Sequence, residues 1–174
     1  MKGEQGPEGS FAEKNAQTGA SVPKVWYSNN VFLNFRLRAS GKDVFFMLEA
    51  GIRGEQSVAV TSENTAKTMG SGTLDVFATP ALVALAEKTC WMSVAAALDE
   101  GCGTVGTRLE LEHSAPTPVG MTVTCESELT AVEGRKLMFK VSLHDEKGPV
   151  GGGVHERFII NNAKFAAKAE AKKG

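Results

Sequence analysis

The chain has 174 residues, of which 42% are hydrophobic and 22% charged. This size and composition are typical of one globular domain with a buried core. The 19 Lys and Arg residues nearly balance the 20 Asp and Glu residues, for a net charge of −1. A nucleic-acid-binding protein is therefore disfavoured, because it needs a basic surplus to neutralise phosphates. No uncharged apolar stretch reaches the roughly 18 residues of a membrane-spanning helix, so no membrane partner is predicted.

The first 46 residues are predicted to form an N-terminal extension, with a domain boundary near Met47. Residues 1–20 carry almost no large apolar side chains. Such a segment cannot bury enough apolar surface to offset the entropy lost on ordering, so we expect it to be disordered. Within residues 31–38, the apolar side chains of the odd-numbered positions alternate with a set that is mostly polar, which permits a short strand.

The cysteines indicate neither a disulfide framework nor a metal site. Cys90, Cys102 and Cys125 are odd in number, and no two of them have the CxxC spacing. We expect them to be small buried hydrophobic side chains in a reducing cytosol. The N-terminus also lacks the basic start and apolar stretch of a secretory signal, so a cytoplasmic location is predicted.

A short strand and a short helix are predicted after the boundary. Gln56, Val58 and Val60 recur with the two-residue period of a strand. Polar residues at 62–64 favour the start of a brief helix that runs to Met69 and ends at Gly70.

The longest predicted element is a helix over residues 80–98. Thr79 is expected to be its N-cap and Pro80 its first helical residue, a frequent pairing at helix starts. The segment contains two charged side chains and ends before Gly101. A helix that is apolar nearly all round must be covered on most sides.

Four strands joined by short turns follow this helix. Each alternates apolar and polar side chains, which predicts an antiparallel meander with one dry face. The predicted strands cover about residues 105–113, 121–130, 137–144 and 150–160, and the first directs Val105, Thr107, Leu109, Leu111 and His113 to one face. Glycines 151–153 within the last strand indicate a bulge or a close approach of another chain.

These elements predict an α+β hot-dog fold, a long central helix wrapped by a curved antiparallel sheet of about five strands. The domain is expected to span residues 47–165. The Ala- and Lys-rich residues 163–173 suggest a frayed helix, so 166–174 are a tail. Because a lone sheet of this kind leaves its edges and part of the helix open, a homodimer or higher homo-oligomer is expected.

Glu87 is the first candidate for chemistry. Its helical neighbours are Val83, Ala84, Cys90 and Trp91, and a carboxylate on such a face is costly to bury unless it is paired or has a task. The alternative is a Glu at the open end of a groove, solvated or in a salt bridge.

His113 is the second candidate. It continues the apolar face of its strand after Leu109 and Leu111, and therefore points toward the helix. A His and a Glu that meet between helix and sheet make an acid–base pair. The alternative is a core histidine with a satisfied hydrogen bond. His144 and His155 are given no role.

Several segments of the chain resemble the fluoroacetyl-CoA-thioesterase-like family of the hot-dog-fold thioesterase superfamily, over about residues 47–165. The matching segments are GTLDVFATPALVALAE (72–87), GTRLELEH (106–113), APTPVG (115–120), VEGR (132–135) and VHER (154–157).

The resemblance implies hydrolysis of acyl-CoA thioesters at a site between the subunits of a dimer, without metal or organic cofactor. The catalytic Thr, Glu and His of the family match Thr79, Glu87 and His113. Its glycine seven residues before the His matches Gly106, and its late-strand arginine matches Arg157, both expected to contact substrate.

One departure from the family concerns the substrate. Members specialised for fluoroacetyl-CoA have phenylalanines just before the Ala-Thr motif, where residues 70–73 here read GSGT. We therefore expect a broader small acyl-CoA rather than the fluorinated one.

In the expected mechanism, Glu87 activates water or attacks the thioester carbonyl directly, and the sequence leaves both routes open. The backbone N–H of Gly106 faces the oxyanion, and His113 polarises the carbonyl or assists the leaving thiolate. Thr79 orients Glu87 or the water, although about 12 Å of helix rise separates the two residues. A non-catalytic acyl-CoA or small-ligand-binding module is the alternative function, and a hot-dog dehydratase ranks below both.

Overall fold

The computed structural model describes residues 25–27, 31–33, 37–40, 43–46 and 48–174. The predicted disorder of residues 1–20 lies outside the described residues. The first four strands form two antiparallel hairpins, β1 with β2 and β3 with β4. Their bounds are β1 Val25–Tyr27, β2 Val31–Leu33, β3 Leu37–Ser40 and β4 Asp43–Phe46.

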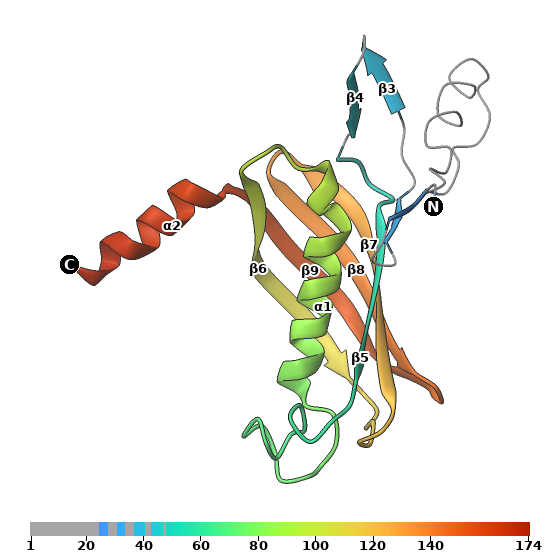
Figure 1. Cartoon of the computed structure of the whole chain (residues 1–174). Coiled ribbons are helices and arrows are strands. Elements are labelled where there is room, and N and C mark those ends of the chain that lie inside the picture. Colours follow the sequence, from blue (N-terminus) through green and yellow to red (C-terminus); the bar gives the residue numbers. More distant parts are fainter. Residues whose placement is uncertain (1–24, 28–30, 34–36, 41–42, 47) are drawn as a thin grey trace, which may run out of the picture.

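The predicted α+β hot-dog fold is confirmed. Five strands form one antiparallel sheet in the order β5-β7-β8-β9-β6, so β5 and β6 are its edges. The long helix α1 lies along one face of this sheet (Figure 1). The bounds are β5 Arg53–Ala59, α1 Thr79–Val94, β6 Cys102–His113, β7 Thr122–Glu133, β8 Lys136–Asp145 and β9 Gly148–Asn161.

The core lies between α1 and the sheet, where the alternation predicted for β7 and β8 is confirmed. Every second side chain of these strands is buried, and each large apolar one contributes about 1.5–3 kcal/mol to stability. The buried side chains are Val123, Cys125, Ser127 and Leu129 of β7 and Leu137, Phe139, Val141 and Leu143 of β8.

A bulge interrupts the alternation in β6. Gly106 pairs with Arg157 and Arg108 with Glu156, so Thr107 is an extra residue in the strand. The predicted inward positions of Val105 and Thr107 are therefore wrong. Before the bulge, Thr104 and Gly106 face Arg157 and Glu87, so Val105 points to the other face. The side chain of Thr107 is exposed and donates to the carbonyl oxygen of Glu156 at 3.2 Å. Beyond the bulge, Leu109 and the later odd-numbered residues are partly buried, as predicted.

The helix predicted for residues 62–69 is wrong, since this segment forms turns. Two of its backbone N–H groups bond to a neighbouring segment instead of to the preceding turn: Ala66 donates to the carbonyl oxygen of Val76 at 2.8 Å, and Lys67 donates to that of Leu74 at 3.1 Å. The side chain of Asn64 accepts from the backbone N–H of Thr61 at 2.9 Å, which favours a turn over a helix start.

Both ends of α1 differ slightly from the prediction. Its N-cap is Ala78 rather than Thr79, and no side chain caps it. The hydroxyl of Thr79 bonds to a histidine instead, as described below. The helix ends at Val94 and continues as a 3-10 turn over Ala95–Ala97.

The sheet does not cover α1 completely, and a short helix follows the last strand. Ala84, Lys88, Trp91 and Ala95 form an exposed stripe along α1. Helix α2 (Asn162–Glu170) leads away from the sheet, as Figure 1 shows, and all of its side chains are exposed. None of the helices in the described ranges is long and apolar enough to cross a bilayer.

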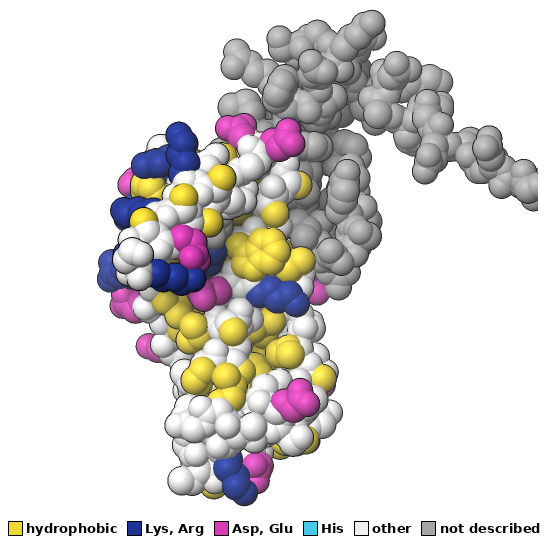
Figure 2. All heavy atoms as spheres, turned by 60° about the vertical axis from the view of Figure 1, so that its left-hand side comes forward, with side chains coloured by type: hydrophobic (Ala, Val, Ile, Leu, Met, Phe, Trp, Pro, Cys, Tyr) yellow, Lys and Arg dark blue, Asp and Glu magenta, His cyan; other side chains and the backbone are white. Residues whose placement is uncertain are grey.

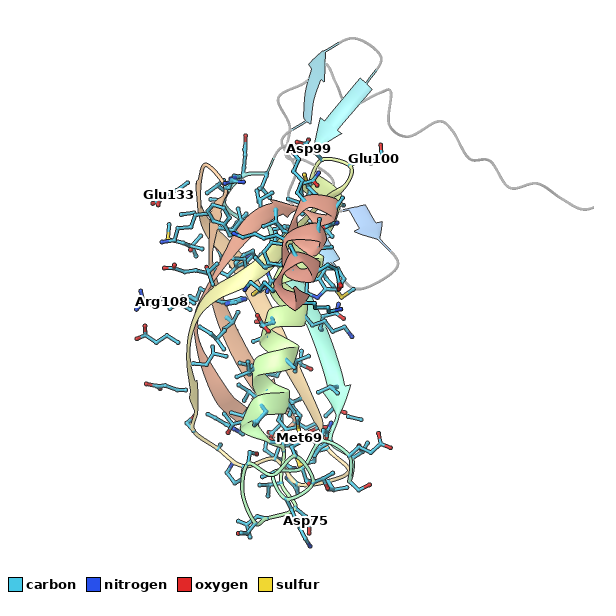
Figure 3. The ribbon with its side chains drawn as sticks, turned by 90° about the vertical axis from the view of Figure 1, so that its left-hand side faces the viewer. Met69, Asp75, Asp99, Glu100, Arg108 and Glu133 are labelled. Atoms are coloured by element: carbon cyan, nitrogen blue, oxygen red, sulfur yellow. The ribbon has the colours of Figure 1, made fainter. Side chains whose placement is uncertain are left out.

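The two ends of α1 define two ends of the molecule. Figure 3 shows Met69 and Asp75 at the end where α1 begins, and Asp99 and Glu100 at the end where it finishes. Arg108, next to the bulge, points outward from the sheet in the same view.

The glycines of β9 lie where the backbone of a neighbouring strand approaches closely, and that strand belongs to the same chain. A Cβ on Gly151 would collide with the carbonyl oxygen of Glu112, and one on Gly153 with that of Glu110. Glycine thus allows β9 to lie tightly against β6.

We predict that Gly151→Ala lowers the free energy of unfolding by about 1–3 kcal/mol, because the added methyl group must push β6 away. Urea denaturation measures this change. Ser142→Ala, at an exposed position of β8, is the control and should change stability little. Equal stability of the two variants would contradict the tight approach.

Candidate active site

Glu87 lies midway along α1, with its carboxylate facing the inner side of β9. Its side chain is 44% exposed, and Oε1 lies 3.4 Å from Nη1 of Arg157 and 3.6 Å from Nε2 of His155. The carboxylate is thus partly in solvent and partly held by a cation, which corresponds to the predicted alternative of a Glu in a salt bridge at an open position.

Gly106 makes room for this carboxylate. It pairs with Arg157 across β6 and β9, and an added Cβ would collide with Oε1 of Glu87 and lie 3.1 Å from Cε1 of His155. Only a residue without a side chain lets the Glu87 carboxylate approach the strand so closely. Gly106 and Glu87 are therefore brought together by the structure.

His155 and Arg157 are buried neighbours on the inner face of β9, two residues apart. The guanidinium donates from Nε to Oγ1 of Thr104 at 2.9 Å and from Nη2 to the carbonyl oxygen of Thr104 at 2.8 Å. Nη1 lies 2.9 Å from Nε2 of His155. Four of the five guanidinium N–H groups thus have partners, counting the contact to Glu87.

These contacts determine the tautomer of His155. Since Arg157 can only donate, Nε2 of His155 accepts, and Nδ1 carries the proton and donates to the carbonyl oxygen of Arg108 at 2.8 Å. Burial, together with the charge of Arg157, lowers the pKa of His155, so the ring is neutral in the folded protein. His155 links the bulge in β6 to the arginine that holds Glu87.

His155 was given no role from the sequence, although its spacing from Arg157 could have indicated one. Arg157 was a candidate, and a residue two positions away in a strand lies on the same face. A histidine there is a natural partner for a buried arginine.

Thr79 and His113 form a second group, at the N-terminal end of α1. Oγ1 of Thr79 lies 2.9 Å from Nδ1 of His113, and the ring of Phe77 packs edge-on against the imidazole. Burial lowers the pKa of His113. Its Nε2 is buried and has no hydrogen-bond partner in the part of the chain that the structure describes.

The two groups are separate within one chain. Among residues 48–174 no hydrogen bond or ion pair joins Glu87 to Thr79 or to His113. Eight residues of helix lie between Thr79 and Glu87, about 12 Å of rise. The expected meeting of Glu87 with His113, and the orientation of Glu87 by Thr79, are not formed inside a single subunit.

The described side chains suggest no metal centre. No group of three or more His, Cys, Asp or Glu residues in these ranges is arranged to hold a metal ion. Cys90, Cys102 and Cys125 are free thiols. Cys90 and Cys125 are buried, as expected, whereas the expectation is wrong for Cys102, which is only partly buried near the start of the edge strand β6.

Comparison with known proteins points to one family. A family model for fluoroacetyl-CoA-specific thioesterases matches residues 60–163. The fluoroacetyl-CoA thioesterase of Streptantibioticus cattleyicolor is 45% identical over 98 residues, which cover 56% of this chain and 70% of that protein.

Solved structures agree with this match. The fluoroacetyl-CoA thioesterase FlK superposes with a TM-score of 0.69 at 37% identity, covering 72% of this chain and 97% of FlK. Structures of FlK mutants include complexes with acetyl-CoA and with fluoroacetate and CoA. A thioesterase superfamily member from Thermus thermophilus has a TM-score of 0.66 at 27% identity, covering 71% of this chain and 92% of its own.

We predict that His155→Gln makes folding stability less dependent on pH. The histidine of an unfolded chain gains a proton near pH 6.5, whereas the folded pKa is lower, so stability is complete above pH 6.5 and falls as the pH drops below it. The variant loses this contribution but keeps that of His113, and urea denaturation between about pH 5 and pH 8 measures the difference.

His144→Gln, an exposed change on β8, is the control for this experiment and should keep the original pH dependence. A His155→Gln variant with an unchanged slope would mean that His155 is not held neutral by its buried contacts.

Proposed function

Because the chain belongs to the family of fluoroacetyl-CoA-specific thioesterases and is thus a thioester hydrolase, we propose that it hydrolyses small acyl-CoA thioesters in the cytoplasm, with Glu87, His113 and Thr79 as catalytic residues. The products are the free acid and CoA. The observation that carries the proposal is the Glu87 carboxylate, half-exposed yet held at Oε1 by Arg157 beside the backbone of Gly106.

Glu87 is the base or the nucleophile. As a base it takes a proton from water while the hydroxide adds to the thioester carbonyl carbon. As a nucleophile its oxygen adds to the same carbon, and water then hydrolyses the resulting anhydride. Arg157 pairs with one carboxylate oxygen, Oε1, and the other oxygen is left for the reaction.

Gly106 and Arg157 are the proposed substrate-binding residues. Without a side chain, the Gly106 backbone is open to a carbonyl group beside Glu87, and its N–H is suited to stabilise the oxyanion of the tetrahedral intermediate. Arg157 supports this position from the paired strand.

His113 assists the carbonyl or the leaving group. Because its pKa is lowered, its imidazole is neutral near pH 7. When the Thr79 hydroxyl donates to Nδ1, the proton resides on Nε2, the nitrogen without a partner among the described residues. From there the N–H donates a hydrogen bond that polarises the carbonyl oxygen or stabilises the thiolate as the C–S bond breaks, and the ring keeps its proton.

A homodimer resolves the separation of the two groups. Strand β6 is a sheet edge that carries Gly106 and His113 seven residues apart. Antiparallel pairing of two such edges about a two-fold axis places the His113 end of one strand beside the Gly106 region of the other. Each site then combines Thr79 and His113 of one subunit with Glu87, Gly106 and Arg157 of its partner.

The segment before α1 supports a substrate other than the fluorinated one. Residues 70–73 are exposed and contain no aromatic side chain. A hydrophobic lid selective for fluoroacetyl-CoA is therefore not expected from this segment, and small acyl-CoA thioesters in general are the proposed substrates.

We predict that Glu87→Gln lowers kcat by about 100-fold or more without loss of folding, because the amide can neither accept the proton nor attack, and that His113→Ala also lowers turnover. Release of CoA from a panel of acyl-CoA thioesters, followed with a thiol-reactive dye, measures this. Full activity of Glu87→Gln would remove Glu87 from the mechanism. Binding of acyl-CoA without release by the unmodified protein would favour the non-catalytic module.

We predict that mixing the Glu87→Gln and His113→Ala variants restores activity. After unfolding together and refolding, half of the dimers are mixed, and in a shared site each mixed dimer has one complete set of residues, which gives about a quarter of normal activity. If each site lies within one chain, the mixture stays as inactive as its components. Sedimentation confirms that dimers have formed.

A further inference from the structure

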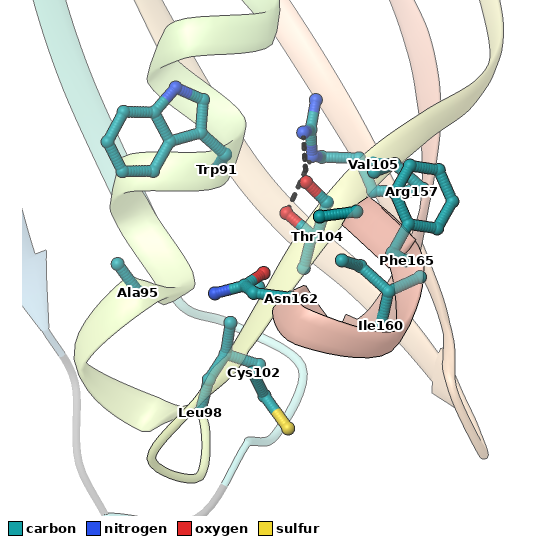
Figure 4. Close-up of a pocket in the computed structure, with 12 residues that line it drawn as sticks. Trp91, Ala95, Leu98, Cys102, Thr104, Val105, Arg157, Ile160, Asn162 and Phe165 are labelled. Atoms are coloured by element: carbon teal, nitrogen blue, oxygen red, sulfur yellow. Dashed lines mark hydrogen bonds between the residues drawn. The ribbon is translucent and has the colours of Figure 1, made fainter. Parts of the chain in front are cut away.

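A pocket of about 530 Å³ lies beside the proposed site, between the C-terminal half of α1, the start of β6, the end of β9 and α2. Trp91 and Phe165 face it from opposite sides, with Asn162 between them (Figure 4). Both aromatic side chains are about half exposed, at 44% and 47%. Figure 2 shows apolar side chains gathered on this side of the molecule.

The pocket borders the arginine that holds the proposed catalytic carboxylate. Arg157 is one of its lining residues, and Nη1 of the same side chain lies 3.4 Å from Oε1 of Glu87. Figure 4 shows its guanidinium bonded to Thr104, which also lines the pocket. A substrate whose carbonyl lies beside Glu87 and Gly106 can therefore extend one of its two ends into this space.

The chemistry of the lining favours the acyl end over the CoA end. The phosphates of CoA require cations, and Arg157 is the one charged residue of the lining, with most of its N–H groups already bonded. The other walls are mainly apolar, from Trp91, Leu98, Val105, Ile160 and Phe165. An uncharged apolar group is stabilised in such a pocket.

We infer that this pocket receives the acyl group of the substrate, so that the enzyme also hydrolyses thioesters of uncharged apolar acyl groups with a medium-length chain or an aryl ring. The volume is within the range of pockets that hold whole small molecules, and is far larger than a two-carbon group requires. This inference rests on the proposed thioesterase function and names its substrate class.

The experiment compares acetyl-CoA, hexanoyl-CoA and phenylacetyl-CoA as substrates of the unmodified enzyme and of Ala95→Phe, which fills the pocket. Ala96→Phe is the matched control, since Ala96 is the next residue, is exposed and does not line the pocket. We expect kcat/KM for the two larger substrates to fall at least about 10-fold in Ala95→Phe, with little change for acetyl-CoA. The control should resemble the unmodified enzyme.

Other outcomes overturn the inference in distinguishable ways. Hydrolysis of acetyl-CoA alone by the unmodified enzyme refutes it but leaves the proposed function intact, whereas no hydrolysis of any thioester refutes the proposed function. An equal rise in KM for all three substrates means that the pocket binds the CoA part. A changed sedimentation coefficient of Ala95→Phe means that this face contacts another subunit.

The rate at which Cys102 is chemically modified provides a second, independent measurement. Cys102 lines the pocket, whereas Cys90 and Cys125 are fully buried and burial raises the pKa of both thiols, that of Cys125 to about 11. The Cys102 thiolate attacks methyl methanethiosulfonate, forming a mixed disulfide and releasing methanesulfinate. In Glu87→Gln, which leaves the thioesters intact, we expect hexanoyl-CoA to slow this reaction more than acetyl-CoA does, and equal protection by the two contradicts the inference.

Discussion

The buried guanidinium of Arg157 is the contact on which the site depends. The Arg157 side chain is only 6% exposed, and burying its charge destabilises the fold unless its N–H groups are hydrogen-bonded. Thr104, His155 and Glu87 accept these hydrogen bonds. Each partner comes from a different element: β6, β9 and α1. The need to pair one cation therefore holds the proposed catalytic carboxylate against the sheet, while the buried apolar side chains of α1 hold the helix itself.

The bulge in β6 is the second constraint. The extra residue, Thr107, lets Gly106 face α1 while Leu109 and His113 also face inward farther along the same strand. Without it, the strict two-residue period would turn either Gly106 or His113 outward. One inserted residue thus allows a single edge strand to carry groups for both parts of the proposed site.

The division of the site between two ends of α1 relates the enzyme's chemistry to its assembly. Under the proposed mechanism, a base on one subunit and a hydrogen-bond donor on the other make catalysis dependent on a dimer, and the face beside Trp91 and Phe165 is left for the acyl group. The exposed 70–73 segment and this pocket are the two features that we propose to set the choice of acyl group.

The amino-acid sequence was enough to predict the central helix, the meander of strands and the candidates Thr79, Glu87 and His113, together with Gly106 and Arg157 from the family resemblance. These predictions depend on periodicity and on local motifs, which are properties of neighbouring residues. Contacts between distant segments could not be predicted in this way, and the folded chain shows them. It replaced the 62–69 helix with turns that bond to residues 74–78, since backbone donors pair with whichever acceptor the fold brings near. It also joined Thr79 to His113 rather than to Glu87, and identified His155, because a buried arginine selects its partners in three dimensions.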